Sequence, residues 1–462
     1  MAEREHILFL TGKLAEPQLR QVLDAMQPEF DYTVHVLGVK VAALMTADMI
    51  ARRLKDTFDA DRILVPGRCR GDLDRLAEMF GIPVQRGPDE LKDLPLFFGK
   101  AGQKPDLSQY RVRIFAEIVD APRMDIPAII ARADYYRTQG ADVIDLGCLP
   151  ETPFSHLAEA VQELKRQGFQ VSVDSLVTED LRTGGLAGAD YLLSLNEDSL
   201  FLLDEVPATP ILIAKEHGDL TSLARAIKYL QQQGRPFLAD PILDPIHFGF
   251  TESIVRYWQL RQDFPDIDIM MGVGNLTELT HADTAGMNAL LFGIGSELDI
   301  AAVLATEVSQ HACKAIKEAD IARRIMYAAK RELRLPKHIN AGLMTVHDTA
   351  PFPYQAEEIQ TLAQQIKDPS YRIQTSPAGI HLYNRDGHHL ADDPFTLYPN
   401  LNVDGDAGHA FYLGVELARA QIAWQLGKRF NQDEMLDWGV AFSNPDAEID
   451  RHDFKPKGST FA

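Results

Sequence analysis

The feature that most constrains this chain is a regular alternation of short apolar runs and helix-like stretches between about Arg111 and Arg334. Eight runs have the length and composition of strands: VRIFAEIV, DVIDLG, FQVSVD, YLLSL, PILIA, PFLAD, IDIMMGV and NALLFG. Eight strand–helix units within about 250 residues are typical of a (β/α)8 barrel. An open doubly wound sheet is the less favoured alternative. We therefore predict an α/β chain with a central TIM barrel over residues 106–335.

Two smaller blocks flank the predicted barrel. Residues 1–105 alternate apolar runs such as HILFLTG and DRILVPGRC with amphipathic stretches such as EPQLRQVLDAM, which predicts a small α/β, Rossmann-like domain. Residues 336–462 contain IHLYNRDGHHL, a hairpin pattern turning at Asp386-Gly387, and then the long helical pattern AFYLGVELARAQIAWQLGKRF. A hairpin that precedes a helix predicts an α+β domain.

The composition restricts the partners of the chain. The sequence has 46 Lys and Arg against 67 Asp and Glu, a net charge of -21, which disfavours nucleic acid and anionic membranes as partners. Cys69, Cys148 and Cys313 are too scattered for a disulfide framework or a zinc site. The N-terminus lacks the long apolar segment of a signal peptide, and no later run could span a bilayer. We expect a cytoplasmic protein that acts on small molecules.

Polar residues recur where the predicted barrel strands end. Asp145 closes the second strand, Asp174 closes the third, Asp240 and Asp244 follow the sixth, and Asn275 follows the seventh. In such barrels the active site lies at the C-terminal ends of the strands. Carboxylates gathered without matching Lys or Arg repel one another, so they require a metal ion or a ligand rich in hydrogen-bond donors. The spacing alone leaves both possibilities open.

Four motifs carry a resemblance to a known family. In order along the chain, GADVIDLG, VSVDS, AGADYLLSLN and ILDPIHFGF resemble the motif set of the dihydropteroate synthases and the related pterin-dependent methyltransferases. The three-block layout resembles the longer dihydropteroate synthase-like proteins of organisms that make tetrahydromethanopterin. The resemblance implies a transferase that condenses a hydroxymethyl-dihydropterin diphosphate with an arylamine, with Mg²⁺ as a candidate cofactor. By analogy it also implies a homodimer.

The resemblance assigns pterin-binding roles to particular residues. Asp145, Asp174 and Asp244 match the carboxylates that line the pterin pocket, and Asp244 is expected to hold the 2-amino group and N3–H. Asn275, in GVGNLTE, resembles the asparagine that the methyltransferases use near the reactive pterin nitrogen. Asn196 is expected to replace the family's pterin-contacting asparagine, because Leu193 occupies the matching position.

The condensation also requires groups that stabilise the departing diphosphate, since negative charge builds there. Lys215 and His217, in IAKEHGD after the fifth strand, are the predicted catalytic residues together with Asn275. Arg123, Thr152 and His247 are the predicted phosphate or anion contacts.

The sequence departs from the synthase pattern in three places. Asp120 stands where the first loop usually has an asparagine, the segment GCLPETPF lacks the usual arginine, and GVGNLTE replaces the basic motif after the seventh strand. These departures keep two alternatives open. The first is methyl transfer from a methyl-tetrahydropterin, and the second is a non-catalytic pterin carrier or scaffold.

Overall fold

The computed structural model describes residues 4–88, 91–99, 105–149 and 152–442. By internal contacts they form two compact units, one within 1–109 and 327–339 and the other within 110–326 and 340–462. The described strands form a closed eight-stranded barrel, a four-stranded sheet before it and a three-stranded sheet after it. The predicted fold class, a TIM barrel with smaller flanking elements, is confirmed, whereas the predicted boundaries of three domains stay a prediction.

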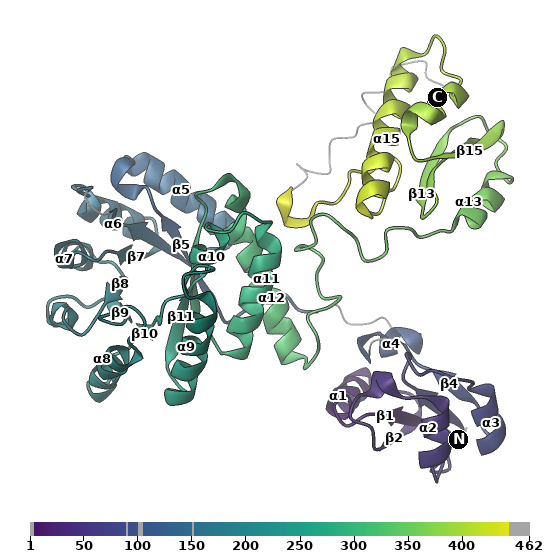
Figure 1. Cartoon of the computed structure of the whole chain (residues 1–462), viewed down its shortest axis with the longest axis horizontal. Coiled ribbons are helices and arrows are strands. Elements are labelled where there is room, and N and C mark those ends of the chain that lie inside the picture. Colours follow the sequence, from purple (N-terminus) through teal and green to yellow (C-terminus); the bar gives the residue numbers. More distant parts are fainter. Residues whose placement is uncertain (1–3, 89–90, 100–104, 150–151, 443–462) are drawn as a thin grey trace. The chain divides into compact units, whose positions relative to one another are not determined.

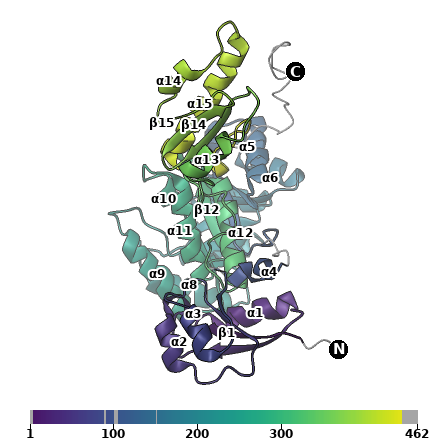
Figure 2. The ribbon, with the colours of Figure 1, turned by 90° about the vertical axis from the view of Figure 1, so that its right-hand side faces the viewer.

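The first sheet is parallel, with the strand order β2-β1-β3-β4. Its central strands are nearly continuous runs of apolar residues because helices cover both of their faces. Figure 2 shows these helices beside the strands. The strands are β1 (His6–Thr11), β2 (Asp31–Val36), β3 (Arg62–Val65) and β4 (Val84–Arg86), and the helices are α1 (Glu16–Met26), α2 (Ala47–Arg53), α3 (Asp74–Phe80) and α4 (Leu94–Phe97).

The barrel consists of eight parallel strands, and β12 pairs with β5 to close it. The strands are β5 (Arg113–Ile118), β6 (Val143–Gly147), β7 (Gln170–Asp174), β8 (Tyr191–Leu195), β9 (Thr209–Leu212), β10 (Leu238–Ala239), β11 (Asp268–Gly272) and β12 (Ala302–Thr306). The helices around them, visible in Figure 1, are α5 (Ile126–Gln139), α6 (Leu157–Arg166), α7 (Thr178–Leu186), α8 (Leu220–Gln232), α9 (Phe250–Asp263), α10 (Gly274–Thr277), α11 (Thr284–Glu297) and α12 (Ala315–Arg331). A 3₁₀ turn, Leu200–Asp204, follows β8 in place of a longer helix.

The first seven predicted barrel strands match β5 to β11, but the prediction of the eighth was wrong. NALLFG (288–293) lies inside α11, and the strand that closes the barrel is β12, with the sequence AVLAT. The buried residues of α11 include Asn288, Leu291, Phe292 and Gly295, whose spacing follows a helix. A short apolar run does not distinguish a strand from a buried helical segment, which explains the error.

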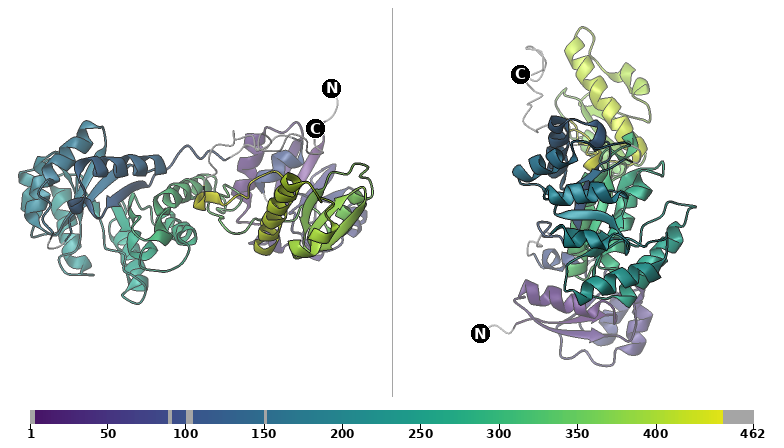
Figure 3. Two further views of the ribbon diagram at one scale, coloured as in Figure 1. Left: turned by 90° about the horizontal axis from the view of Figure 1, so that it is seen from above. Right: turned by 90° about the vertical axis from the view of Figure 1, so that its left-hand side faces the viewer.

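The C-terminal elements form an antiparallel sheet, β13-β14-β15, against which the long helix α15 packs (Figure 3). The hairpin turns at Arg385-Asp386, one residue earlier than predicted, because Asn384 pairs with Gly387. The predicted tail HDFKPKGSTFA lies outside the described residues. The elements are α13 (Ala356–Ala363), β13 (Arg372–Ser376), β14 (Gly379–Asn384), β15 (Gly387–Ala391), α14 (Pro394–Leu397) and α15 (Ala407–Leu426).

None of the helices in the described part of the chain combines the length and apolar character that crossing a membrane requires. The three cysteines are all free.

Candidate functional site

A cavity of about 520 Å³ opens at the C-terminal ends of the barrel strands. We call it the mouth cavity. Its side walls are apolar and include Leu193, Ile211 and Leu304. Among the described residues that line it there is no Lys, Arg or His. Its polar side chains are those of Glu117, Asp174, Ser194, Asp240, Asn275, Glu278, Thr306 and Ser309.

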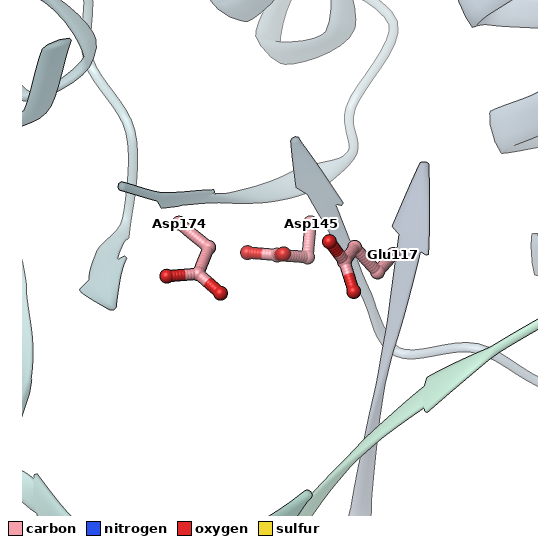
Figure 4. Close-up of side chains that lie close together, drawn as sticks. All are labelled: Glu117, Asp145 and Asp174. Atoms are coloured by element: carbon pink, nitrogen blue, oxygen red, sulfur yellow. The ribbon is translucent and has the colours of Figure 1, made fainter. Parts of the chain in front are cut away.

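Three carboxylates come together at this end of the barrel because of the strand register. Glu117 of β5 is paired with Asp145 of β6, and Asp145 is paired with Ser172 of β7. Asp174 lies two residues beyond Ser172 and therefore on the same face of its strand. One oxygen from each of Glu117, Asp145 and Asp174 lies within 4.8 Å of the others. Figure 4 shows these side chains, which we call the carboxylate triad, with Asp145 between the other two.

The triad has few hydrogen-bond partners. Asp145 is fully buried, and neither of its carboxylate oxygens has a partner. The hydroxyl of Ser172, also fully buried, has none either. Only Asp174 is engaged, by Ser194 Oγ, which donates to Asp174 Oδ1 over 2.7 Å. Buried carboxylates without partners are costly, and the triad therefore has hydrogen-bonding and ligating capacity that the described side chains do not use.

Ser194 adopts an unusual backbone conformation to reach Asp174. Its φ angle is +69°, and the pairing of β8 with β9 shifts register between Leu192 and Leu195. A positive φ is uncommon for a serine inside a strand, and bulges of this kind often redirect a side chain near a functional site. The local distortion thus turns the Ser194 hydroxyl towards the triad.

Burial raises the pKa of each member of the triad, and repulsion between carboxylates adds to the increase for Glu117 and Asp145. Burial raises the pKa of Glu117 to about 7, and the charge of Asp174 adds to the increase. Burial raises the pKa of Asp145 well above its usual value, and so do the charges of Asp174 and Glu117, whereas the nearby Ser172 hydroxyl, although outside regular hydrogen-bond geometry, lowers it. Burial also raises the pKa of Asp174, against the lowering effect of the Ser194 hydrogen bond. The three groups therefore hold protons more tightly than isolated carboxyl groups do, unless a cation or a donor-rich ligand compensates them.

The oxygen donors of the triad are those that hard divalent cations prefer. Cys148 follows β6, but burial raises the pKa of its thiol to about 12, so it stays protonated and is a poor ligand. The donor set thus fits a magnesium-like ion and does not fit zinc.

Asp240 faces the triad across the mouth cavity. Its Oδ1 accepts hydrogen bonds from the backbone N–H of Ile242 and from the hydroxyl of the buried Tyr257, both over 2.7 Å. Burial raises its pKa to about 6 despite these bonds. Nearby, Asn275 Nδ2 donates to the carbonyl of Leu243 over 2.8 Å, which fixes the orientation of its amide.

Asp244 lies outside the lining of the mouth cavity and is engaged by two basic side chains. Arg256 donates to its Oδ2 over 2.6 Å, and His217 Nε2 lies 3.0 Å from its Oδ1. Gly249, with φ +117°, is required here because a Cβ would lie 2.9 Å from Asp244 Oδ2. The structure brings Asp244 and His217 together, and their predicted roles with a pterin and a diphosphate stay predictions.

The remaining predicted residues do not line the mouth cavity. Lys215 is exposed and pairs with Asp198 over 2.8 Å. Asn196 Oδ1 accepts from the backbone N–H of the same Asp198. Arg123 is exposed and lies 3.5 Å from Asp120, Thr152 is half-buried, and His247 is exposed. Their assignments as catalytic, pterin or phosphate contacts remain untested.

A second cavity, of about 680 Å³, lies between the ends of β5 and β12 and helix α5. We call it the side cavity. It shares Glu117 with the mouth cavity and contains Arg132, Tyr135 and Glu307. Burial raises the pKa of Glu307 to about 7, and its Oε1 accepts from the Ile316 N–H over 3.0 Å.

Sequence reasoning missed Glu117, Glu307 and Arg256. Glu117 lies within the predicted strand VRIFAEIV, and its alternation with the buried residues beside it was the available signal. Glu307 follows a strand that was not recognised. Arg256 gave no local signal, since it reaches Asp244 from the next helix.

Comparison with known proteins gives two kinds of likeness. Residues 5–89 match the model of a family of unknown function, DUF6513. Three solved structures that are similar to part of this chain are dihydropteroate synthases. They come from Yersinia pestis, from Xanthomonas albilineans in complex with 7,8-dihydropteroate, and from Vibrio fischeri. They are 16%, 17% and 12% identical, cover 49% of this chain and 94–95% of their own, and have TM-scores of 0.37, 0.37 and 0.38. TM-scores of this size are too low to transfer function.

A much fuller match exists in sequence. The uncharacterized protein MJ0107 of Methanocaldococcus jannaschii is 30% identical over 531 aligned residues, which cover 94% of this chain and 99% of the relative. The chain therefore belongs to the same protein family as MJ0107.

Proposed function

We propose that this protein binds a pterin in the mouth cavity and condenses a hydroxymethyl-dihydropterin diphosphate with an arylamine. The observation that carries the proposal is the set of carboxylates facing that cavity, Glu117, Asp174 and Asp240, with no basic side chain among the described lining residues. A carboxylate can accept two parallel hydrogen bonds from the adjacent N–H groups of an amidine-like ring edge. A pterin presents such an edge.

The size and walls of the mouth cavity agree with a flat heterocycle. Its volume of about 520 Å³ lies in the range of small-molecule sites. Apolar side chains such as Leu193, Ile211 and Leu304 form walls against which a ring can pack. The ordered motifs GADVIDLG, VSVDS, AGADYLLSLN and ILDPIHFGF, which resemble those of dihydropteroate synthases, support the same choice of ligand.

Within this proposal, Asp174 and Asp240 contact the ring edge of the pterin, whereas Asp244 lies outside the cavity lining and acts indirectly. Because Asp244 is held by Arg256 and His217, its role is to position the segment that carries Asp240 and Ile242. If the motif resemblance holds in detail, Asp244 must instead exchange these partners for the pterin. The two versions differ in what Asp244→Asn does to the affinity.

The side cavity is the proposed place for the arylamine, because it adjoins the mouth cavity at Glu117. In the reaction the amine nitrogen bonds to the pterin methylene carbon. The bond from that carbon to the diphosphate oxygen breaks, the oxygen keeps the electron pair, and the amine loses one proton. Since no described basic residue lines the mouth cavity, Mg²⁺ dependence is part of the proposal. We place this homodimeric, cytoplasmic transferase in tetrahydromethanopterin or folate-type cofactor biosynthesis.

A second candidate function is methyl transfer from a methyl-tetrahydropterin. A non-catalytic carrier would bind the pterin in the same way but transfer nothing. The observation that favours methyl transfer is Asn275, which lines the mouth cavity and has its amide oriented by the Leu243 carbonyl. An oriented amide can donate to or accept from a ring nitrogen whose charge changes during transfer.

Calorimetric titration tests these functions. The full chain is titrated with 7,8-dihydropterin and with 6-hydroxymethyl-7,8-dihydropterin diphosphate, each with and without Mg²⁺. Tighter binding of the diphosphate with Mg²⁺ supports the synthase, and diphosphate release with an arylamine such as 4-aminobenzoate confirms turnover. Binding of the bare pterin alone favours methyl transfer or a carrier.

Matched variants locate the ligand. Asp174→Asn and Asp240→Asn are each expected to weaken pterin binding at least tenfold, whereas Asp263→Asn, an exposed change at the end of α9, leaves it unchanged. Asp244→Asn is expected to have a smaller effect if Asp244 only positions its segment. Wild-type protein that binds neither pterin would refute the proposal.

A further inference from the structure

We infer that the carboxylate triad binds a hard divalent cation at a position below the mouth cavity. The inference begins with Asp145. Glu117 and Asp174 line the mouth cavity, but Asp145 lines neither that cavity nor the side cavity. A heterocycle resting in the mouth therefore does not reach the most deeply buried carboxylate of the triad. A single ion is small enough to do so.

Two unsatisfied groups mark the position. Both oxygens of the fully buried Asp145 lack hydrogen-bond partners, and so does the fully buried hydroxyl of Ser172, its register partner on β7. Native interiors pair almost all such groups, so several orphans together indicate something missing from the protein alone. In Figure 4 the Asp145 carboxylate lies between those of Asp174 and Glu117.

The charge balance points to a cation. No Lys, Arg or His of the described chain forms an ion pair with Glu117, Asp145 or Asp174, or appears among the groups that shift their pKa values. Three adjacent carboxylates without a counter-charge repel one another. A divalent ion would neutralise most of their charge at once.

The spacing suits a hard ion. Calcium–oxygen distances are about 2.3–2.6 Å, so two ligands on opposite sides of the ion lie about 4.6–5.2 Å apart, and magnesium requires about 4.2 Å. The three donor oxygens lie within 4.8 Å of one another. Because no pair of these oxygens is farther apart than 4.8 Å, one hard divalent ion such as Ca²⁺, Mn²⁺ or Mg²⁺ can take all three as ligands. The all-carboxylate donor set disfavours softer metals.

This inference shares Glu117 and Asp174 with the proposed function, but it can be tested separately because it depends on Asp145, which lines neither cavity. The test uses Mn²⁺ alone as the probe. The full chain is stripped with EDTA and titrated with Mn²⁺, and free Mn²⁺ is followed by electron paramagnetic resonance. We expect one saturable site per chain from which Mg²⁺ and Ca²⁺ displace Mn²⁺.

Variants assign the site. Asp145→Asn and Glu117→Gln are each expected to weaken Mn²⁺ binding at least tenfold, and the matched change Asp263→Asn should leave it as in the wild type. Mn²⁺ should also raise the Tm of the wild type and of Asp263→Asn, but not that of Asp145→Asn. Should Asp145→Asn fold poorly, Glu117→Gln carries the test, since Glu117 is less buried.

Absence of a saturable Mn²⁺ site in the wild type would overturn the inference, and so would wild-type affinity in both triad variants. Titration of the same preparation with 7,8-dihydropterin separates the two proposals. Pterin binding without Mn²⁺ binding refutes only the cation site, and Mn²⁺ binding without pterin binding refutes only the proposed function.

Discussion

Carboxylates at the two ends of the barrel differ in whether basic side chains of the protein pair with them. At the N-terminal end, the buried guanidinium of Arg323 donates to Asp320 over 2.8 Å and to Asp142, and it also donates to the carbonyls of Val112 and Gly140. The ring of Tyr110 stacks on it at 3.5 Å. At the C-terminal end, no described Lys, Arg or His pairs with the triad, and only the nearby Ser172 hydroxyl offsets the rise in the pKa of Asp145.

The difference separates a charge cluster that the protein compensates from one that it does not. Carboxylates that hold strands and helices together are stabilising only if a partner compensates them, and Arg323 provides that compensation. A carboxylate that no basic group of the protein compensates can receive a cation without displacing such a partner. The triad is therefore expected to lower the stability of the unliganded protein, and the Arg323 cluster to raise it.

The largest expected effect is at the N-terminal end. Arg323→Met would leave the buried Asp320 and the half-buried Asp142 without their main charged partner and should destabilise the chain by about 3–5 kcal/mol. Arg324→Met is the matched control, since Arg324 also pairs with Asp320 but is more exposed, and it should cost about 1 kcal/mol or less. Urea unfolding measures both. Equal losses of unfolding free energy in the two variants would show that the burial of Arg323 is unimportant for the stability of the cluster.

Gly140 tests the packing around the same cluster. Its φ is +107°, and an added Cβ would lie 2.6 Å from Cβ and Cγ of Asp320, so Gly140→Ala should cost about 2–3 kcal/mol from strain and displacement. Gly168→Ala is the control, because Gly168 also has a positive φ but no atom within 4 Å, and it should cost about 1 kcal/mol. A similar loss in both variants would mean that the Asp320 contact contributes nothing.

A neutralising substitution in the triad should change the stability of the fold in the opposite direction and increase it. In metal-free protein, Asp145→Asn replaces an uncompensated carboxylate with a neutral amide of the same size and should stabilise the fold by about 1–2 kcal/mol at pH 8. Thermal unfolding in EDTA gives the measurement. A clear loss of stability would place Asp145 with Asp142 and Asp320 as a structural carboxylate and would remove the contrast between the two ends.

The smallest expected effect concerns Glu307 of the side cavity. Its pKa is raised from 4.5 to about 7 in the folded protein, so the folded state binds the proton more tightly than the unfolded state does. The stability that this proton provides is complete below about pH 4.5 and is lost as the pH rises to about 7. A shift of this size corresponds to about 3 kcal/mol for a fully buried group. Because Glu307 is only half-buried, solvent screening reduces the effect, and Glu307→Gln should flatten this part of the stability profile by about 1 kcal/mol. An unchanged profile would show that Glu307 is not the source of the fall.

The sequence was informative where chemistry follows from strand order. Parallel strands put their C-terminal ends at one edge, so Asp145 and Asp174 could be placed together from the apolar runs alone. It was less informative where a contact depends on another element. The partner of Asp244 is Arg256 on the next helix, and the exposure of Lys215 and Arg123 depends on loops that strand patterns do not describe. The eighth strand was missed because α11 is apolar on most of its surface.

The shortness of β10 has a mechanical consequence. This strand contributes only Leu238 and Ala239 to the hydrogen-bonded belt of the barrel. The loop after it is held from outside by α9, since Tyr257 bonds to Asp240 and Arg256 bonds to the carbonyl of Ile242. Part of the wall of the mouth cavity is thus held in place by side chains of α9 and not by hydrogen bonds within the sheet. A small displacement of α9 would carry Asp240, Ile242 and Asp244 with it as one piece.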